Sequence, residues 1–295
     1  MSIKKSINSL YSHPYNLNHP FWAILRWAKW NVKKRIYKGP WTEKIWGGKK
    51  SHFWPDSDQS MYLARNWVMD WDEFNFIRKY ISSSDNVIDV GANIGVYVIW
   101  ISQFLDERGK IVAFEPDPVN YERLKAQINL NRIKFARAEK MALSNKKGVL
   151  KMSSGKNGEN HVVSGKQQEY SHKLNEVKCT ILDSYVDKIG MKNIDFLKID
   201  VEGFEKYVLE GAKNVLSSDC VDVVQLEVNN QSKKFQIEKT EGVKLLKKFG
   251  YDSFVYRHEK NSIDRLNASY LSRKNHINVL FSKNVKKIGK KVTRV

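Results

Sequence analysis

The chain has 295 residues and a formal net charge of +19, with 41% hydrophobic and 12% aromatic residues. This composition suffices for one large or two modest folded domains, and it excludes a wholly disordered chain. The charge lies at the two ends, because residues 1–54 carry a net +10, residues 283–295 a net +6, and residues 55–282 only +3. A broad basic surface over the body of the protein, as in many nucleic-acid-binding domains, is therefore not expected.

Cysteine content and apolar runs bear on the cellular compartment. Cys179 and Cys220 lack metal-site or C-x-x-C spacing, and we expect both to be free thiols in a reducing compartment. No early apolar run resembles a signal peptide, and no uncharged run is long enough to span a bilayer. The sequence predicts a cytoplasmic protein, either soluble or peripheral at a membrane surface, and leaves its oligomeric state open.

Residues 1–71 are predicted to form a basic N-terminal extension that is rich in tryptophan. An amphipathic helix is expected after Pro20, with Trp27, Trp30 and several Lys and Arg side chains outside its apolar stripe. The stripe consists of Phe21, Ile24, Leu25, Ala28, Val32 and Ile36. We favour packing of the stripe against the main domain. The alternatives are an anionic membrane surface and, with least support, nucleic acid.

Residues 72–283 alternate between strand and helix patterns. Strands are expected at 86–90, 110–116, 135–143, 177–183, 194–201, 221–228, 252–257 and 276–282, and helices at 96–106, 117–131, 203–216 and 238–249. Repeated β-α-β units predict an α/β domain with a mainly parallel sheet covered on both faces. Residues 144–175 interrupt the alternation as loops or hairpin strands, and residues 284–295 are predicted to be a basic C-terminal tail.

Two strand ends have the pattern of a nucleotide-like cofactor site. The turn "DVGANIG" follows the strand at 86–90, and Glu115 ends the next strand, where an acid can accept both hydroxyls of a ribose. A dinucleotide site would require glycines at positions 91, 93 and 96, but Asn93 and Val96 occupy two of them. The pattern therefore favours S-adenosylmethionine over NAD.

Five segments together resemble the FkbM family of S-adenosylmethionine-dependent methyltransferases, most of whose described members are O-methyltransferases. They are "VIDVGANIGVY", "AFEPDPVNYERLKAQINLN", "ALSNKKG", "TILDSYV" and "IDFLKIDVEGFEKYVLEGAKNVL", in this order between about residues 85 and 230. The resemblance implies the class I, Rossmann-like fold, with seven strands in the order 3-2-1-4-5-7-6 and the last strand antiparallel. It also implies the residues that contact the cofactor. These are Asp89, Gly91, Asn93 and Gly95 at the methionine end, Glu115 on the ribose, and Pro116, Ala142, Leu143 and Ser144 beside the adenine.

The segment "KIDVEG" places charge at the end of another strand. Lys198, Asp200 and Glu202 are two residues apart and share one face of the strand, so we expect them beside the transferable methyl group. Asp200 and Glu202 are candidate bases, and Lys198 would keep Asp200 ionised or orient a substrate oxygen. A structural Lys198–Asp200 pair, with Glu202 favouring the helix dipole, is the alternative.

Other candidates come from the interrupting segment and from the next strand. His161 and His172 lie within residues 144–175 and are rival bases or acceptor-binding residues, although surface-loop roles remain open. Glu227 ends the next strand and is expected near the acceptor. No metal cluster is evident, but a cation shared by Asp200, Glu202 and Glu227 stays open.

The expected activity is methyl transfer from S-adenosylmethionine to a hydroxyl of a sugar, a glycan or a small hydroxylated metabolite. The segment 144–175 would form part of the acceptor site. One alternative is an RNA ribose methyltransferase, which the near-neutral body of the protein disfavours. The other is a non-catalytic adaptor at a membrane surface with a vestigial cofactor pocket.

Overall fold

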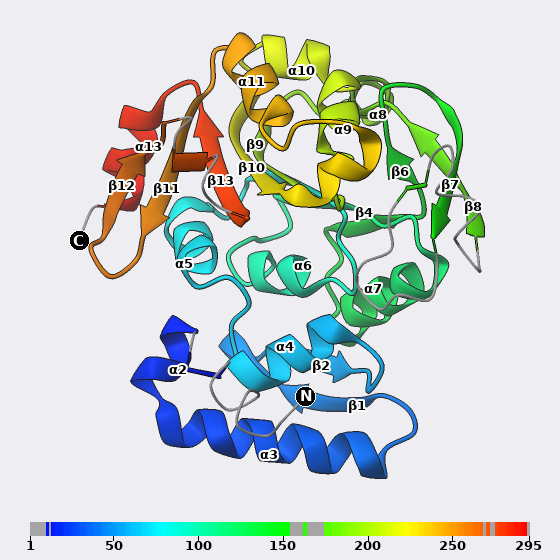
Figure 1. Ribbon diagram of the computed structural model, residues 1–295, viewed down its shortest axis with the longest axis vertical. Coiled ribbons are helices and arrows are strands. Elements are labelled where there is room, and N and C mark those ends of the chain that lie inside the picture. Colours follow the sequence, from blue (N-terminus) through cyan, green and yellow to red (C-terminus); the bar gives the residue numbers. More distant parts are fainter. Residues whose placement is uncertain are drawn as a thin grey trace.

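The computed structural model describes residues 10–11, 13–153, 162–163, 174–267, 270–271 and 275–293. The predicted site residues His161 and His172 lie outside these ranges. The N-terminal part contains α2 (Pro14–Asn18), α3 (Pro20–Ile36), β1 (Trp41–Lys44), the short helix η1 (Trp46–Gly48), β2 (Lys50–Phe53) and α4 (Asp58–Asn66). Figure 1 shows these elements beneath a large twisted sheet.

The remaining elements follow in chain order. The first half contains α5 (Trp71–Tyr80), β3 (Asn86–Val90), α6 (Val96–Ile101), β4 (Lys110–Phe114), α7 (Pro118–Leu130), β5 (Ala136–Glu139), β6 (Ala142–Leu143), β7 (Gly148–Ser153) and β8 (Leu174–Thr180). The second half contains α8 (Leu182–Ile189), β9 (Ile194–Ile199), α9 (Glu205–Glu210), α10 (Lys213–Ser217), β10 (Val221–Asn229), η3 (Asn230–Phe235), α11 (Glu241–Lys248), β11 (Asp252–Arg257), β12 (Ser262–Arg265), β13 (His276–Ser282) and α13 (Val285–Val292).

The central sheet has eight strands in the order β12-β11-β13-β10-β9-β3-β4-β5. Strands β10, β9, β3, β4 and β5 pair in parallel, whereas β13 is antiparallel to both β10 and β11. Without β12, this is the order 3-2-1-4-5-7-6 with the last strand antiparallel. The class I methyltransferase sheet expected from the resemblance is therefore confirmed. The additional strand β12, which was not predicted, pairs with the outer edge of β11.

Helices cover both faces of the sheet, with α5, α6 and α7 on one face and α8 to α11 on the other (Figure 1). A hydrophobic core lies on each face of the sheet, and consecutive residues of one strand pack into opposite cores because strand side chains alternate between the two faces. Val87 packs with the core that contains α5 and α6, whereas Ile88 packs with the core on the opposite face. All four of the central strands β3, β4, β9 and β10 are thus buried on both faces, as is typical of parallel sheets.

The tryptophans of the N-terminal segment join it to the main domain. The indole of Trp46 meets the rings of Trp100 and Phe74 edge to face, at centroid distances of 4.9 and 5.7 Å. Trp30, Trp41 and Phe53 belong to the same hydrophobic cluster. The segment and one face of the sheet therefore share a single core.

The apolar stripe of α3 does not pack against the main domain, so the favoured orientation of this helix was wrong. Its buried side chains are Ala23, which was not part of the predicted stripe, and Trp30, which was predicted to lie outside it. Phe21, Val32 and Ile36 of the stripe are 66%, 55% and 68% exposed. The periodicity was real, but the face opposite the stripe is the one that packs, and Trp30 on that face is only 4% exposed.

The predicted strand at 135–143 is divided between two sheets. Its first part is β5 in the central sheet, and its last part is β6, which pairs in parallel with β8 in a separate three-stranded sheet of order β6-β8-β7. Strands β7 and β8 form the antiparallel pair expected of hairpin strands in the interrupting segment. The predicted helix at 203–216 is likewise divided, into α9 and α10, and begins two residues later.

The predicted basic C-terminal tail is a helix over most of its length. In α13, Val285, Ile288 and Val292 are buried in the same core as α5, while lysines occupy the outer face. Three apolar residues at a spacing of three and four form the stripe of an amphipathic helix. The charge of this segment had obscured that pattern in the sequence analysis.

Candidate active site

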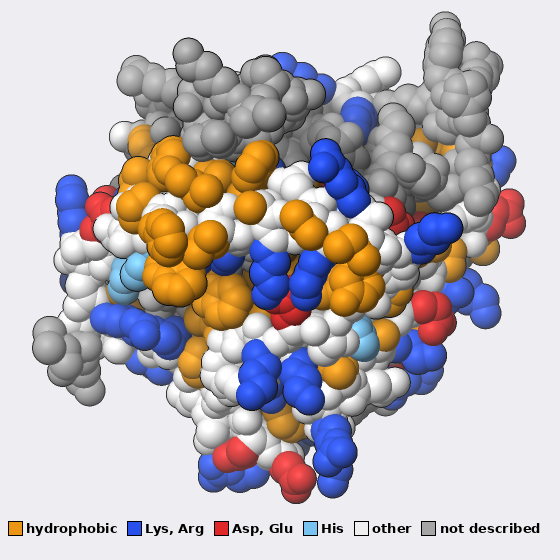
Figure 2. All heavy atoms as spheres, turned by 90° about the horizontal axis from the view of Figure 1, so that it is seen from below, with side chains coloured by type: hydrophobic (Ala, Val, Ile, Leu, Met, Phe, Trp, Pro, Cys, Tyr) orange, Lys and Arg blue, Asp and Glu red, His pale blue; other side chains and the backbone are white. Residues whose placement is uncertain are grey.

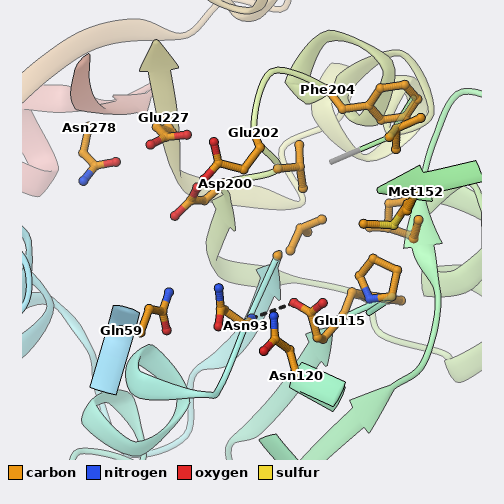
Figure 3. Close-up of a pocket in the computed structure, with 18 of the residues that line it drawn as sticks. Gln59, Asn93, Glu115, Asn120, Met152, Asp200, Glu202, Phe204, Glu227 and Asn278 are labelled. Carbon is orange, nitrogen blue, oxygen red and sulfur yellow. Dashed lines mark hydrogen bonds between the residues drawn. The ribbon is translucent and has the colours of Figure 1, made fainter. Parts of the chain in front are cut away.

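A cavity of about 340 Å³ lies beyond the carboxyl ends of β3, β4, β9 and β10. Its volume falls in the usual range for small-molecule sites, roughly 300–1,000 Å³. Its position is the one where open α/β sheets bind ligands, at the point where the strand order reverses. Figure 3 shows carboxylates from β9 and β10 on one side of this cavity and apolar side chains on another.

The turn after β3 brings the backbone directly into the cavity. Gly91 has a φ of +83°, and a Cβ atom there would lie 1.8 Å from the backbone oxygen of Asp200. Only glycine therefore fits between the ends of β3 and β9. Asn93, which lines the cavity, also has a positive φ of 50°, a conformation that asparagine tolerates better than most residues.

Glu115 at the end of β4 is fixed by two backbone donors. Its Oε2 accepts a hydrogen bond of 2.7 Å from the backbone N–H of Asn93, and its Oε1 accepts one of 2.9 Å from that of Asp117. Burial raises the pKa of Glu115 to about 8, although the two N–H groups oppose this shift. The carboxyl group is therefore rigidly placed and faces the cavity with its remaining lone pairs (Figure 3).

One end of the cavity is apolar. Phe204 and Met152 close it in Figure 3. The opposite end, which holds the carboxyl groups of Asp200, Glu202 and Glu227, is called the acidic end. The apolar lining residues are Phe114, Pro116, Met141, Ala142, Leu143, Met152, Val162 and Phe204. A flat, weakly polar ring such as adenine suits this surface. Met152 and Val162 come from the interrupting segment, so its described residues reach the apolar end rather than the acidic one.

Lys198 lies beneath the acidic end, buried at 3% exposure. Its Nζ donates a hydrogen bond of 2.9 Å to Oδ2 of Asp200, lies 3.6 Å from Oδ1 of Asp89, and stands 4.6 Å from the centre of the Tyr97 ring. Burial alone would lower the pKa of Lys198, but the charges of Asp200 and Asp89 outweigh it and raise this pKa. The ammonium group is therefore charged and balances two carboxyl groups.

Asp89 lies opposite Lys198 in the register of β3 and β9 and is fully buried. Neither of its carboxyl oxygens has a hydrogen-bond partner among the described residues. Burial raises the pKa of Asp89, and the charge of Lys198 opposes that shift. Asp89 therefore supports the wall of the cavity from behind rather than lining it.

Asp200 and Glu227 form a hydrogen-bonded carboxyl pair at the ends of adjacent strands. Burial would raise the pKa of Asp200, but the charge and hydrogen bond of Lys198 outweigh it and lower this pKa. Burial and the charge of Asp200 raise the pKa of Glu227 well above its usual value. At neutral pH the pair thus contains an ionised Asp200 and a protonated Glu227, as expected when two carboxyl groups share one site.

Glu227 has two further partners. Its Oε2 accepts a hydrogen bond of 2.6 Å from Nδ2 of Asn229, and its Oε1 lies 3.1 Å from Nδ1 of His276. His276 and Asn278 belong to β13 and reach the cavity because β13 pairs with β10. The antiparallel strand therefore adds polar side chains to the acidic end.

Glu202 is held in the cavity by a strained turn. Its φ is +54°, in the left-handed region that non-glycine residues rarely adopt. The carboxylate of Glu205 accepts hydrogen bonds from the backbone N–H groups of Val201 and Gly203, at 3.2 and 3.0 Å, and so fixes this turn. Strain that surrounding contacts maintain is common at functional sites. Glu205 was not predicted, although it continues the "DVEG" motif.

The structure brings most of the predicted site residues to one cavity. Its lining includes the predicted residues Gly91, Asn93, Glu115, Pro116, Ala142, Leu143, Asp200, Glu202 and Glu227. Four predicted residues are not among those that line the cavity. Asp89 and Lys198 lie within β3 and β9, Gly95 lies in the turn after β3, and Ser144 follows β6 directly.

Other lining residues were missed by the sequence analysis. Gln59 and Tyr62 of α4, Asp70 before α5, and His276 and Asn278 of β13 all line the cavity. Asp70 accepts a hydrogen bond of 2.5 Å from the Tyr97 hydroxyl. Of these residues, only Asp70 has a local sequence signal that could have found it, because Asp is a common residue directly before a helix. Within the described part of the chain, no group of three or more His, Cys, Asp or Glu side chains could hold a metal ion.

The chain is similar to known methyltransferases. The family model for the methyltransferase FkbM domain matches residues 89–253. Methyltransferase 1 of Beauveria bassiana (strain ARSEF 2860) is 25% identical over 174 residues, which are 52% of this chain and 68% of that protein. Methyltransferase sdnD of Sordaria araneosa is 27% identical over 160 residues, which are 44% of this chain and 61% of that protein.

Among solved structures, methyltransferase FkbM from Methylobacillus flagellatus KT aligns with a TM-score of 0.44 and 13% identity. The alignment covers 68% of this chain and 44% of that one. The chain thus spans less than half of this structure and about two thirds of the two fungal relatives.

Proposed function

The chain belongs to the methyltransferase FkbM family, and from this premise we propose that it methylates a hydroxyl group of a sugar or another small polyhydroxylated acceptor. The family and the fold make it an S-adenosylmethionine-dependent methyltransferase. S-adenosylmethionine supplies a methyl group that is activated on a sulfonium centre. The chain's own residues then have three tasks, which are to hold the donor, to orient the acceptor and to accept a proton.

The cavity has the features that this cofactor requires. Gly91 leaves room for close approach to the backbone, Glu115 offers rigid acceptors for ribose hydroxyls, and the apolar end that contains Phe204 suits adenine. The acidic end suits a positively charged sulfonium and ammonium. We assign Glu115 to the ribose, and Pro116, Ala142 and Leu143 to the adenine. Asp89, Gly95 and Ser144 would support these contacts from behind the lining.

The carboxyl pair Asp200–Glu227 is the observation that carries the acceptor proposal. Asp200 is the ionised member of the pair and has Lys198 as its counter-ion, so it can accept a hydrogen bond from an acceptor hydroxyl and receive its proton. Glu227 is protonated and can donate a hydrogen bond, whereas Asp200 is ionised and can accept one. The pair therefore suits a hydroxyl group, which both donates and accepts.

Polar side chains around the pair suit an acceptor with several hydroxyl groups. Gln59 and Asn278 face the carboxyl pair from α4 and β13 (Figure 3). Amides both donate and accept, as does a sugar hydroxyl. Glu202 is the second candidate to contact the acceptor. An RNA substrate is disfavoured because its phosphates would meet the carboxyl groups at this end of the cavity.

The experiment compares two isosteric substitutions at the pair. Asp200→Asn removes the ionised acceptor and is expected to lower the rate of methyl transfer by about 10²–10⁴-fold. Glu227→Gln replaces a protonated group by a neutral one and is expected to retain the rate within about tenfold, because a general base is not lost. Both variants should bind S-adenosylmethionine in calorimetry, which separates loss of chemistry from loss of the cofactor.

The assay incubates the purified chain with methyl-labelled S-adenosylmethionine and separate panels of nucleotide sugars, glycans and RNA. Label in a carbohydrate fraction, stable to conditions that cleave methyl esters, supports O-methylation of a sugar. Label only in RNA, or an Asp200→Asn variant as active as the unmodified chain, would contradict the proposal.

A further inference from the structure

The outer face of α3 is an apolar surface that the described part of the protein does not cover. We define it by the side chains Phe21, Trp22, Ile24, Leu25, Val32 and Ile36, which are between 41% and 68% exposed. Figure 2 shows apolar and basic side chains side by side over this end of the molecule. Eight of the eleven exposed large hydrophobic side chains in the described residues lie between Leu17 and Tyr37. Such clustering differs from the scattered exposure that is normal for soluble proteins.

The helix is held on the molecule by its opposite face. Trp30 packs against Trp41 with a ring-centroid distance of 5.2 Å, and the Nε of Arg26 donates a hydrogen bond of 3.2 Å to the backbone oxygen of Arg65 in α4. Side chains on opposite faces of a helix point in opposite directions, so they cannot pack against the same neighbouring element. The inner face is therefore occupied by the protein itself, and the outer face is directed away from it (Figure 1).

Basic side chains border the outer face. Arg35 near the C-terminal end of α3 and Lys38 just after the helix are exposed on this side, whereas Lys34, four residues after Trp30, projects from the inner face. Lys29 and Lys33 pair with Glu43, so part of their charge is already balanced. Residues 1–54 nevertheless carry a net charge of +10. An apolar stripe with flanking cations is typical of helices that lie in the interface of an anionic bilayer.

We propose that the outer face of α3 docks the protein on the surface of a membrane that contains anionic lipids. The apolar side chains enter the boundary between headgroups and acyl chains, and Arg35 and Lys38 meet lipid phosphates. No helix among the described residues is long and apolar enough to cross a bilayer. The 17-residue helix α3 therefore lies in the plane of the membrane.

A lipid surface fits this face better than a second copy of the chain does. In a symmetric dimer through α3, the N-terminal segments of the two copies, each with a net charge of +10 over residues 1–54, would lie side by side and repel each other. An anionic bilayer instead complements both the charge and the apolar stripe. Helix α4, which packs on α3, also contributes Gln59 and Tyr62 to the cavity, so docking brings the acceptor end near the lipid surface.

The test is flotation of the full chain with vesicles of phosphatidylcholine alone and with phosphatidylglycerol added. We expect binding to the anionic vesicles, and a loss of at least about tenfold in the double variant Leu25→Asp/Val32→Asp, which moves two exposed apolar side chains out of the bilayer. The matched control is Val119→Asp/Val149→Asp, at positions that are 55% and 59% exposed elsewhere, and it should bind normally. Unchanged melting temperatures show that both variants remain folded.

A charge variant separates the electrostatic part of binding. Arg35→Glu/Lys38→Glu should weaken binding to the anionic vesicles by about tenfold or more. Quenching of tryptophan fluorescence by brominated lipid should fall in Trp22→Phe, since Trp22 is 59% exposed on the outer face.

Absence of the unmodified chain from floated anionic vesicles, or equal binding by the Leu25→Asp/Val32→Asp variant, would overturn the proposal. A dimer in solution that this variant dissociates would instead assign the face to a second copy.

Discussion

The ammonium group of Lys198 donates a 2.9 Å hydrogen bond to Asp200 and lies 3.6 Å from Asp89, so one buried cation supports both strand ends next to the cavity. The pairing follows from the register of β3 and β9, in which Asp89 and Lys198 are direct partners. Asp200 follows two residues later on the same face. The electrostatics of the acidic end therefore depend on one side chain that does not itself line the cavity.

Substitution of Lys198 by methionine is predicted to destabilise the fold. It leaves Asp89 without its cation, and breaking a buried pair on one side typically costs about 3–5 kcal/mol. We expect a loss of this size in the free energy of unfolding, measured by urea denaturation at neutral pH. The double variant Lys198→Met/Asp89→Asn should recover part of it. A Lys198→Met variant that loses less than about 1 kcal/mol would show that the pair does not support the sheet.

Gly91 gives a test of the backbone contact between β3 and β9. Gly91→Ala places a methyl group 1.8 Å from the Asp200 oxygen, and we expect cofactor binding to disappear in calorimetry. Gly190→Ala is the matched control, because Gly190 also has a positive φ, of +64°, but no atom within 4 Å of the added Cβ. It should cost only the left-handed strain of about 1–2 kcal/mol and leave cofactor binding intact. Equal effects in both variants would exclude the steric explanation.

Much of the site could be predicted because parallel strands place their carboxyl ends together. Asp89, Glu115, Asp200 and Glu227 each end or nearly end a strand in the sequence, and the structure brings all four to one side of the sheet. Alternation along the strand also placed Lys198 on the face of Asp200. These inferences need only the period of a strand and the direction of the chain.

The remaining features depend on tertiary contacts that no local pattern encodes. Periodicity showed that α3 has an apolar stripe, but not which face the protein would bury, and the structure buries the face that carries Ala23 and Trp30. His276 and Asn278 reach the cavity only because β13 inserts beside β10. The division between α9 and α10 falls at Gly211 and Ala212, and Gly211 packs so closely that a Cβ there would lie 2.0 Å from the backbone oxygen of Ser144.

Glu202 allows strain and function to be separated. Because its φ is +54°, Glu202→Gly should be more stable than Glu202→Ala by about 1 kcal/mol in urea denaturation, after the greater unfolded-state entropy of glycine is counted. Gln236, with a φ of +58°, should show the same difference. Methyl transfer should fall in both Glu202 variants and in neither Gln236 variant. Full activity of Glu202→Gly would remove Glu202 from the acceptor site.

The stability of the free protein is predicted to fall as the pH rises through neutrality. Burial raises the pKa of Glu115 to about 8 and that of Glu205 to about 7, above the ordinary value of 4.5. Between the ordinary and the raised pKa the folded state binds more protons than the unfolded state, so the free energy of unfolding decreases with rising pH. Melting temperatures measured from about pH 5 to about pH 8 should decline, and less steeply in Glu115→Gln.

Cofactor affinity should depend on pH in the opposite direction. Ribose hydroxyls that donate to Glu115 favour its ionised form, so binding of S-adenosylmethionine lowers the raised pKa of about 8 and releases a proton near neutral pH. Calorimetry in buffers of different ionisation enthalpy measures this release directly. The affinity should increase from about pH 6 to about pH 8 in the unmodified chain and remain nearly flat in Glu115→Gln, whose side chain does not titrate. Proton release that persists in Glu115→Gln would assign the linked group to another residue and contradict the ribose contact.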